Sequence, residues 1–208
     1  VVWLIGTLLV AGLSFWLVLS AINAARDDGV ATSPKGSESA AASATDDSSD
    51  DDDGPYEIAA GIDFDPEADG GNDEENPDRT GDAFDGDPET GWPTMEYHNH
   101  AELGRLKPGV GLILDLGEAK QIREVDLLFD DAGTSVEIRV PEDSETDSAP
   151  MDTEKSWQTV ASQDDAGQEV TLSVDEGTKA QFVMVYLTKL PEASSARYRG
   201  VINEVSVS

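Results

Sequence analysis

A period of two in the apolar residues after Tyr56 constrains the fold most strongly. Short stretches alternate apolar and polar side chains, as a strand does when it buries one face. Phe182–Leu187 is almost continuously apolar, which suits a strand buried on both faces. No later stretch shows a helical period. We expect about eight strands, over residues 56–62, 112–116, 125–129, 136–140, 157–161, 170–174, 182–187 and 201–207.

These strands predict an all-β domain over residues 56–208, folded as a two-sheet jelly-roll β-sandwich. Glu142–Ser156 is too polar for a strand and is expected to form a surface loop.

The first segment, Val1–Ile22, has no charged side chain. As a helix it would be about 33 Å long, enough for a hydrocarbon core of about 30 Å. A cleaved signal peptide is the alternative, but the run exceeds the usual apolar length of about 7–15 residues. We therefore expect one transmembrane helix in residues 1–25. Because few basic residues follow, residues 26–208 are expected on the extracytoplasmic side of the cell membrane.

Residues 26–55 are rich in Ala, Ser, Thr, Gly and Asp, and they include an acidic run at Asp50–Asp53. This composition predicts a disordered acidic linker. Over the whole chain, 13 Lys and Arg oppose 44 Asp and Glu, for a net charge of −31. Such a surface repels phosphate backbones, which excludes nucleic acid as a partner. The absence of cysteine excludes disulfides and thiolate chemistry.

One short segment, Asp82–Trp92, has the sequence DAFDGDPETGW. Its Asp and Thr oxygens lie a few residues apart on a sharp turn, as calcium requires. The segment resembles the opening of coagulation-factor type C (discoidin) domains and galactose-binding-like carbohydrate-binding modules. The resemblance implies a jelly roll with a structural calcium, held by an early loop and by a Glu of the last strand. The matching residues are Asp85, Asp87, Thr90 and Glu204.

A narrower resemblance comes from the order of the membrane helix, the acidic linker, FDPEADG, DGDPETGWPTMEY and LGRLKPGVGLILDLG. It is similar to the C-terminal extracytoplasmic end of actinobacterial MviN/MurJ-type lipid II flippases of peptidoglycan synthesis. The resemblance implies that flippase and kinase-like domains precede Val1. It also implies that this chain is a non-catalytic module that binds a glycan or a cell-wall precursor.

Aromatic and basic side chains are scarce here, so those on the connections after the 82–92 segment and before the last strand are the best ligand candidates. For Arg197–Arg199, a loop that only neutralises nearby carboxylates is an equally open interpretation. The candidates are Tyr97, His98, Arg105, Arg197 and Tyr198.

Three further patterns have both a functional and a structural reading. The acidic stretch from Asp63 to Glu74 suggests a second calcium or a solvated loop. His98 and His100 form at most a weak zinc site. Trp92 and Trp157 could stack on a sugar or belong to the core. No nucleophile elbow, phosphate-binding loop or zinc-protease motif is present, so we expect no enzyme.

Two other contexts remain open. The domain could be the ligand sensor of a membrane receptor or Ser/Thr kinase, or an accessory module of a cell-wall hydrolase. The residues that precede Val1 would separate these alternatives.

Overall fold

The computed structural model describes residues 54–143 and 146–208. The predicted transmembrane helix and nearly all of the predicted linker lie outside these residues. Within them, no helix is both long enough and apolar enough to cross a membrane.

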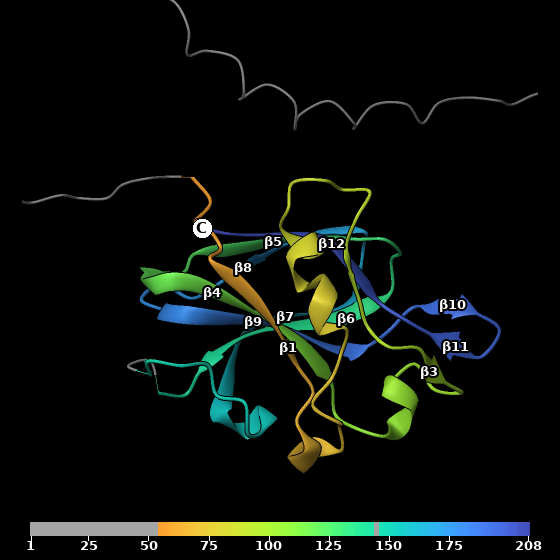
Figure 1. Cartoon of the computed structure of the whole chain (residues 1–208). Helices are drawn as coiled ribbons and strands as arrows, with labels where there is room; N and C mark the ends of the chain where they lie inside the picture. The colour runs from red at the N-terminus through yellow and green to blue at the C-terminus, as the bar shows by residue number, and fades with distance from the viewer. Residues whose placement is uncertain (1–53, 144–145) are drawn as a thin grey trace, which may run out of the picture. The chain divides into compact units, whose positions relative to one another are not determined.

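The described chain is all-β, and each strand expected from the sequence is present (Figure 1). One sheet has five strands in the order β1-β4-β9-β6-β7, and a second has four in the order β2-β12-β5-β8. Every strand pairing is antiparallel. The bounds are β1 Ala60–Phe64, β2 Trp92–Pro93, β4 Val110–Gln121, β5 Glu124–Phe129, β6 Thr134–Pro141, β7 Trp157–Ala166, β8 Glu169–Ser173, β9 Lys179–Lys189 and β12 Val201–Val207.

The main core fills the space between these two sheets. Alternate residues of β4 and β9, such as Leu112 and Val185, face alternate residues of β5 and β12, such as Leu127 and Ile202. Trp92 is fully buried in this core. Burying large side chains on two facing sheets is what holds a sandwich together, at about 1.5–3 kcal/mol for each.

The outer face of the five-stranded sheet carries a second apolar cluster. Ile113 and Met184, paired in register, turn away from the main core and meet Phe64, Trp157 and Tyr186. In the predicted loop over residues 142–156, the described residues 142–143 and 146–156 form a loop with one short 3-10 helix, η4 (Glu154–Ser156). It also covers part of this cluster, because the indole nitrogen of Trp157 donates to Pro150 O at 3.0 Å. Trp92 and Trp157 are therefore core residues.

The shorter elements were not predicted. A third sheet joins β10 (Glu192–Ser194), β11 (Arg197–Tyr198) and β3 (Tyr97–His98). Three more 3-10 helices lie in the connections: η1 (Glu67–Asp69), η2 (Pro77–Ala83) and η3 (Leu103–Arg105). Each of these elements is too short for hydrophobic periodicity to reveal it.

Close packing between β4 and β9 requires glycine at position 109. A Cβ on Gly109 would lie 2.4 Å from the Tyr186 ring and 2.8 Å from the Leu187 carbonyl oxygen. We expect Gly109→Ala to lower the free energy of unfolding by about 1–3 kcal/mol, since overpacking forces neighbours apart. Gly81→Ala is the control, because nothing lies within 4 Å of its added Cβ. Equal denaturation midpoints for the two variants would contradict this account.

Candidate functional site

The loop between η2 and β2 gathers oxygen atoms around Thr90. The Thr90 hydroxyl lies 3.0 and 3.1 Å from the two carboxylate oxygens of Asp85, 2.9 Å from Asp87 O and 3.5 Å from Asp82 O. A hydroxyl has one hydrogen and can satisfy one of these acceptors. The other oxygens carry free lone pairs, and calcium prefers oxygen ligands of this kind.

Glu204 of β12 lies beside this loop. Burial raises the pKa of the Glu204 carboxyl, and the Asp85 carboxylate adds to the increase, while the backbone N–H groups of Gly86 and Asp87 oppose it. Its Oε1 atom is buried without a hydrogen-bond partner. The structure therefore places Asp85, Thr90 and Glu204 close together, whereas the Asp87 side chain accepts from Glu89 N at 3.1 Å and faces its own turn.

Neighbouring Asn203 fastens the same loop to the last strand. Its side-chain nitrogen donates to Pro88 O at 3.1 Å and to Thr90 O at 3.0 Å. Among the described residues, no three His, Asp or Glu side chains are grouped so as to hold a metal ion. An ion at this loop would accordingly depend on Asp85, Glu204 and the Thr90 hydroxyl, supplemented by carbonyl oxygens.

The acidic stretch from Asp63 to Glu74 is organised differently. Its carboxylates accept backbone N–H groups: Asp63 from Glu75 at 2.5 Å, Asp73 from Glu67 at 3.2 Å and Asp69 from Glu154 at 2.6 Å. These side chains cap the loop and fix its course. The arrangement supports the structural reading of this stretch over a second calcium site.

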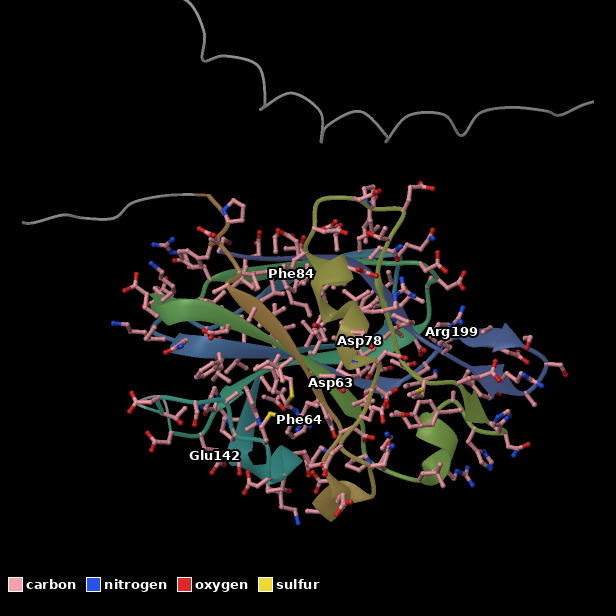
Figure 2. The ribbon with its side chains drawn as sticks, in the orientation of Figure 1. Asp63, Phe64, Asp78, Phe84, Glu142 and Arg199 are labelled. Atoms are coloured by element: carbon pink, nitrogen blue, oxygen red, sulfur yellow. The ribbon has the colours of Figure 1, made fainter. Side chains whose placement is uncertain are left out.

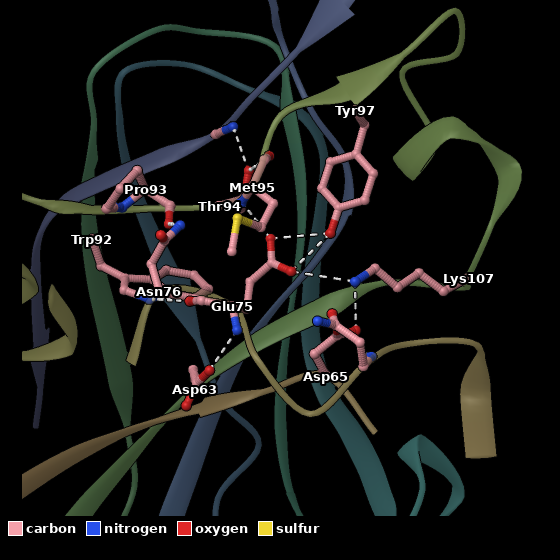
Figure 3. A network of polar contacts seen from close by, with 12 residues as sticks. Asp63, Asp65, Glu75, Asn76, Trp92, Pro93, Thr94, Met95, Tyr97 and Lys107 are labelled. Carbon is pink, nitrogen blue, oxygen red and sulfur yellow. Dashed lines mark hydrogen bonds and ion pairs between the residues drawn. The ribbon is translucent and has the colours of Figure 1, made fainter. Parts of the chain in front are cut away.

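A buried polar network lies next to this stretch (Figure 3). The Glu75 carboxylate accepts from Tyr97 OH at 2.8 Å, from Met95 N at 2.5 Å and from Lys107 Nζ at 3.2 Å. Lys107 also pairs with Asp65. The side chains of Lys107, Asp65 and Glu75 are 6%, 1% and 0% exposed. Sequence reasoning missed this network, because Glu75 sits in a run of acidic residues that looks like a solvated loop.

Burial controls the ionisation of this network. It raises the pKa of the Glu75 carboxyl, although Lys107, the Met95 N–H and the Tyr97 hydroxyl act in the opposite direction. Burial and the neighbouring Glu75 carboxylate raise the pKa of Tyr97. Tyr97 is thus a buried hydroxyl donor, only 6% exposed, and its ring is not open to a ligand from solvent.

Strand pairing unites the two connections that carry the predicted ligand residues. In β3 and β11, Arg197 lies opposite His98, and Tyr198 lies opposite Tyr97. Because side chains alternate between the faces of a sheet, the predicted set is split. The two tyrosines face inward, where Tyr198 is half-buried against the main core, and His98 and Arg197 face outward.

The outward face is polar and exposed. An Arg197 guanidinium nitrogen lies 2.8 Å from Glu96 Oε1, and His98 Nε2 lies 3.9 Å from the same oxygen. Arg105 is exposed on η3, whose Gly104 N–H donates to His100 O at 3.0 Å and so holds the helix beside β3. We call Glu96, His98, Arg105 and Arg197 the β3–β11 surface.

Backbone strain gathers beside this surface. Asn99, Leu103, Arg105 and Ala196 have φ values of 70°, 46°, 60° and 54°, in the left-handed region that L residues rarely adopt. Such conformations persist where surrounding contacts enforce them, and they cluster at ligand sites. Leu106, which follows Arg105 in the chain, is 70% exposed.

Fold and surface together define a β-sandwich module with a polar surface on its third sheet. No protein-family model and no curated protein matches the sequence. Its structural neighbours are carbohydrate-binding modules. One is the family 32 module (CBM32) of AlyQ in complex with 4,5-unsaturated mannuronic acid, at 18% identity and a TM-score of 0.49, covering 74% of this chain and 97% of that one.

Two further structural neighbours are also carbohydrate-binding modules. One is chitosan-binding module 2, in complex with chitotriose, from a chitosanase/glucanase of Paenibacillus sp. IK-5, at 24% identity, a TM-score of 0.47 and coverage of 71% and 94%. The other is a Clostridium perfringens CBM32 module, at 14% identity, a TM-score of 0.43 and coverage of 64% and 86%. We infer no ligand from likenesses at this level.

The buried network makes Lys107 essential for stability. We expect Lys107→Met to lower the free energy of unfolding by about 3–5 kcal/mol, because it strands two buried carboxylates without their cation. Lys189→Met is the matched control. Lys189 pairs with Asp165, but both side chains are more than a third exposed, and such pairs contribute at most about 1 kcal/mol. Urea denaturation measures both, and similar losses would contradict a central role for the network.

Proposed function

We propose that residues 56–208 form a non-catalytic glycan-binding module whose ligand lies on the β3–β11 surface. The observation that supports this most directly is the pairing of β3 with β11. It sets the Arg197 guanidinium beside His98, at a place in the fold where Arg105 is also exposed. Scarce basic and imidazole groups are thereby concentrated on one small face of a strongly acidic chain.

The chemistry of this surface suits hydroxyl groups. A guanidinium supplies several N–H donors, the Glu96 carboxylate supplies acceptors, and a neutral imidazole supplies one of each. Sugar hydroxyls both donate and accept, so they can engage all three. His98 and Arg197 lie in paired strands, which limits the entropy that their backbone loses on binding.

The buried acids Asp65 and Glu75 are occupied by contacts within the fold, which supports a binding role over a catalytic one. A general acid or base must reach the substrate. Glu75, whose pKa is raised, and Asp65 are instead enclosed with Lys107 and Tyr97. Their contacts stabilise the fold beneath the surface.

For the cellular setting, we propose a membrane-tethered module at the extracytoplasmic end of a lipid II flippase. The support for this setting is the order of sequence segments from the uncharged run Val1–Ile22 to the DGDPETGWPTMEY motif. In that position the module would bind the glycan part of peptidoglycan or of its precursor outside the membrane.

Glycan titration of the domain tests the binding role. We expect N-acetylglucosamine oligosaccharides to shift the NMR signals of His98 and Arg197. We expect Arg197→Gln to weaken binding about tenfold, the loss of one charged hydrogen bond. The control is Arg123→Gln, which removes an exposed arginine of the turn between β4 and β5. If no fragment perturbs the surface at millimolar concentration, the module does not bind these wall glycans.

We also propose a structural calcium between the 85–90 loop and the last strand. The support is the convergence of Asp85, Thr90 and Glu204, together with the unpartnered Oε1 of Glu204. A cation there would offset the repulsion between the two carboxylates. It would also clamp an early loop to the end of the chain.

Calcium should therefore stabilise the folded domain. At a hundredfold excess over Kd, binding to the folded state alone contributes about 2.7 kcal/mol. We expect chelator to lower the melting temperature of the wild type and to leave that of Glu204→Gln unchanged. Glu169→Gln, an exposed carboxylate of β8, should keep the response. Superimposable wild-type melting curves with calcium and with chelator would overturn the proposal.

A further inference from the structure

We propose that Glu96 determines the specificity of the β3–β11 surface, selecting neutral, hydroxyl-rich glycans over glycans that carry a carboxylate or phosphate. The inference rests on the proposed glycan-binding function and extends it to the charge of the ligand. Sequence reasoning did not single out Glu96 as a ligand residue.

Geometry carries the first step. Glu96 Oε1 lies 2.8 Å from the Arg197 guanidinium and 3.9 Å from His98 Nε2, so one carboxylate oxygen faces both predicted ligand residues. The exposed fractions of the Glu96, Arg197 and His98 side chains are 37%, 53% and 60%, so solvent reaches all three. A ligand on this surface would meet the pair together.

The second step compares two kinds of ligand. A neutral sugar can donate a hydroxyl to the free lone pairs of Glu96 and accept from the remaining N–H groups of Arg197, leaving the ion pair intact. An anionic group that pairs with Arg197 must displace Glu96 or lie against it as a like charge. Either outcome weakens binding of the anion, and a repulsive element of this kind is how a site rejects a wrong partner.

The third step asks why such a pair is present. An ion pair this exposed contributes little to the stability of the fold. We therefore assign the Glu96–Arg197 pair a role in the selection of ligands by their charge. The neighbouring charges do not reverse its effect. Three exposed arginines lie in or near β3, η3 and β11: Arg105, Arg197 and Arg199 (Figure 2 labels Arg199). The same segments carry an equal number of exposed glutamates, Glu96, Glu102 and Glu192. The chain as a whole has a net charge of −31, which opposes the approach of anions from every side.

The test uses two probes that differ in one charge. They are the disaccharide of N-acetylglucosamine and N-acetylmuramic acid, which carries a carboxylate, and the methyl ester of that carboxylate. We expect the wild-type domain to bind the ester about fivefold more tightly than the acid, as for one like charge a few ångströms away in water. In Glu96→Gln this ratio of Kd values should fall to about one, because Arg197 becomes free for the acid.

A matched variant separates local from general charge effects. Glu118→Gln removes an equally negative, exposed side chain that pairs with Lys120 near the end of β4, away from the third sheet. It should keep the wild-type ratio, and all three proteins should have similar melting temperatures. If the wild type binds both probes and Glu96→Gln leaves the ratio unchanged, Glu96 does not set selectivity and the glycan-binding function stands. If the wild type binds neither probe, the selectivity role fails with the binding function.

Discussion

The Glu75 carboxylate is the contact on which the arrangement of the loops depends. Its side chain holds Met95, Tyr97 and Lys107, and its backbone carbonyl accepts the Trp92 indole N–H at 2.9 Å. One buried acid therefore fixes several points of the segment from β2 to the residues after η3. A buried charge is tolerated only where such partners surround it. This explains why so polar a cluster lies beside the main core.

The same solution recurs at smaller scale around the domain. Where the chain lacks apolar residues to hold a connection, a carboxylate accepts backbone N–H groups, as Asp69 does for η4 and Asp63 for Glu75. Arg139 holds another connection through its side chain. Its guanidinium lies 3.9 Å from the centroid of the Tyr186 ring and pairs with Glu154 of η4. Several carboxylates of this domain consequently serve to close loops.

The longer strands could be predicted because periodicity reports burial directly, and Leu112, Val125 and Val136 each mark one. Only the family resemblance implied that Glu204 lies beside the Asp85 loop, because the two residues are at opposite ends of the domain sequence. The role of Glu75 could not, since its partners lie 17 to 32 residues away and nothing near it signals burial. The inward turn of Tyr97 was missed for a related reason: a two-residue strand shows no period, so its two faces become apparent only once β11 is paired with it.

That alternation has an evolutionary consequence. Along β3 and β11, neighbouring residues serve opposite purposes, with Tyr97 bound into the buried network and His98 open to solvent. Under the proposed function, substitutions at positions 96, 98 and 197 would change what the surface recognises without disturbing the contacts that keep the sandwich folded. A lineage could therefore diversify the ligand of this module one exposed residue at a time, at nearly constant stability.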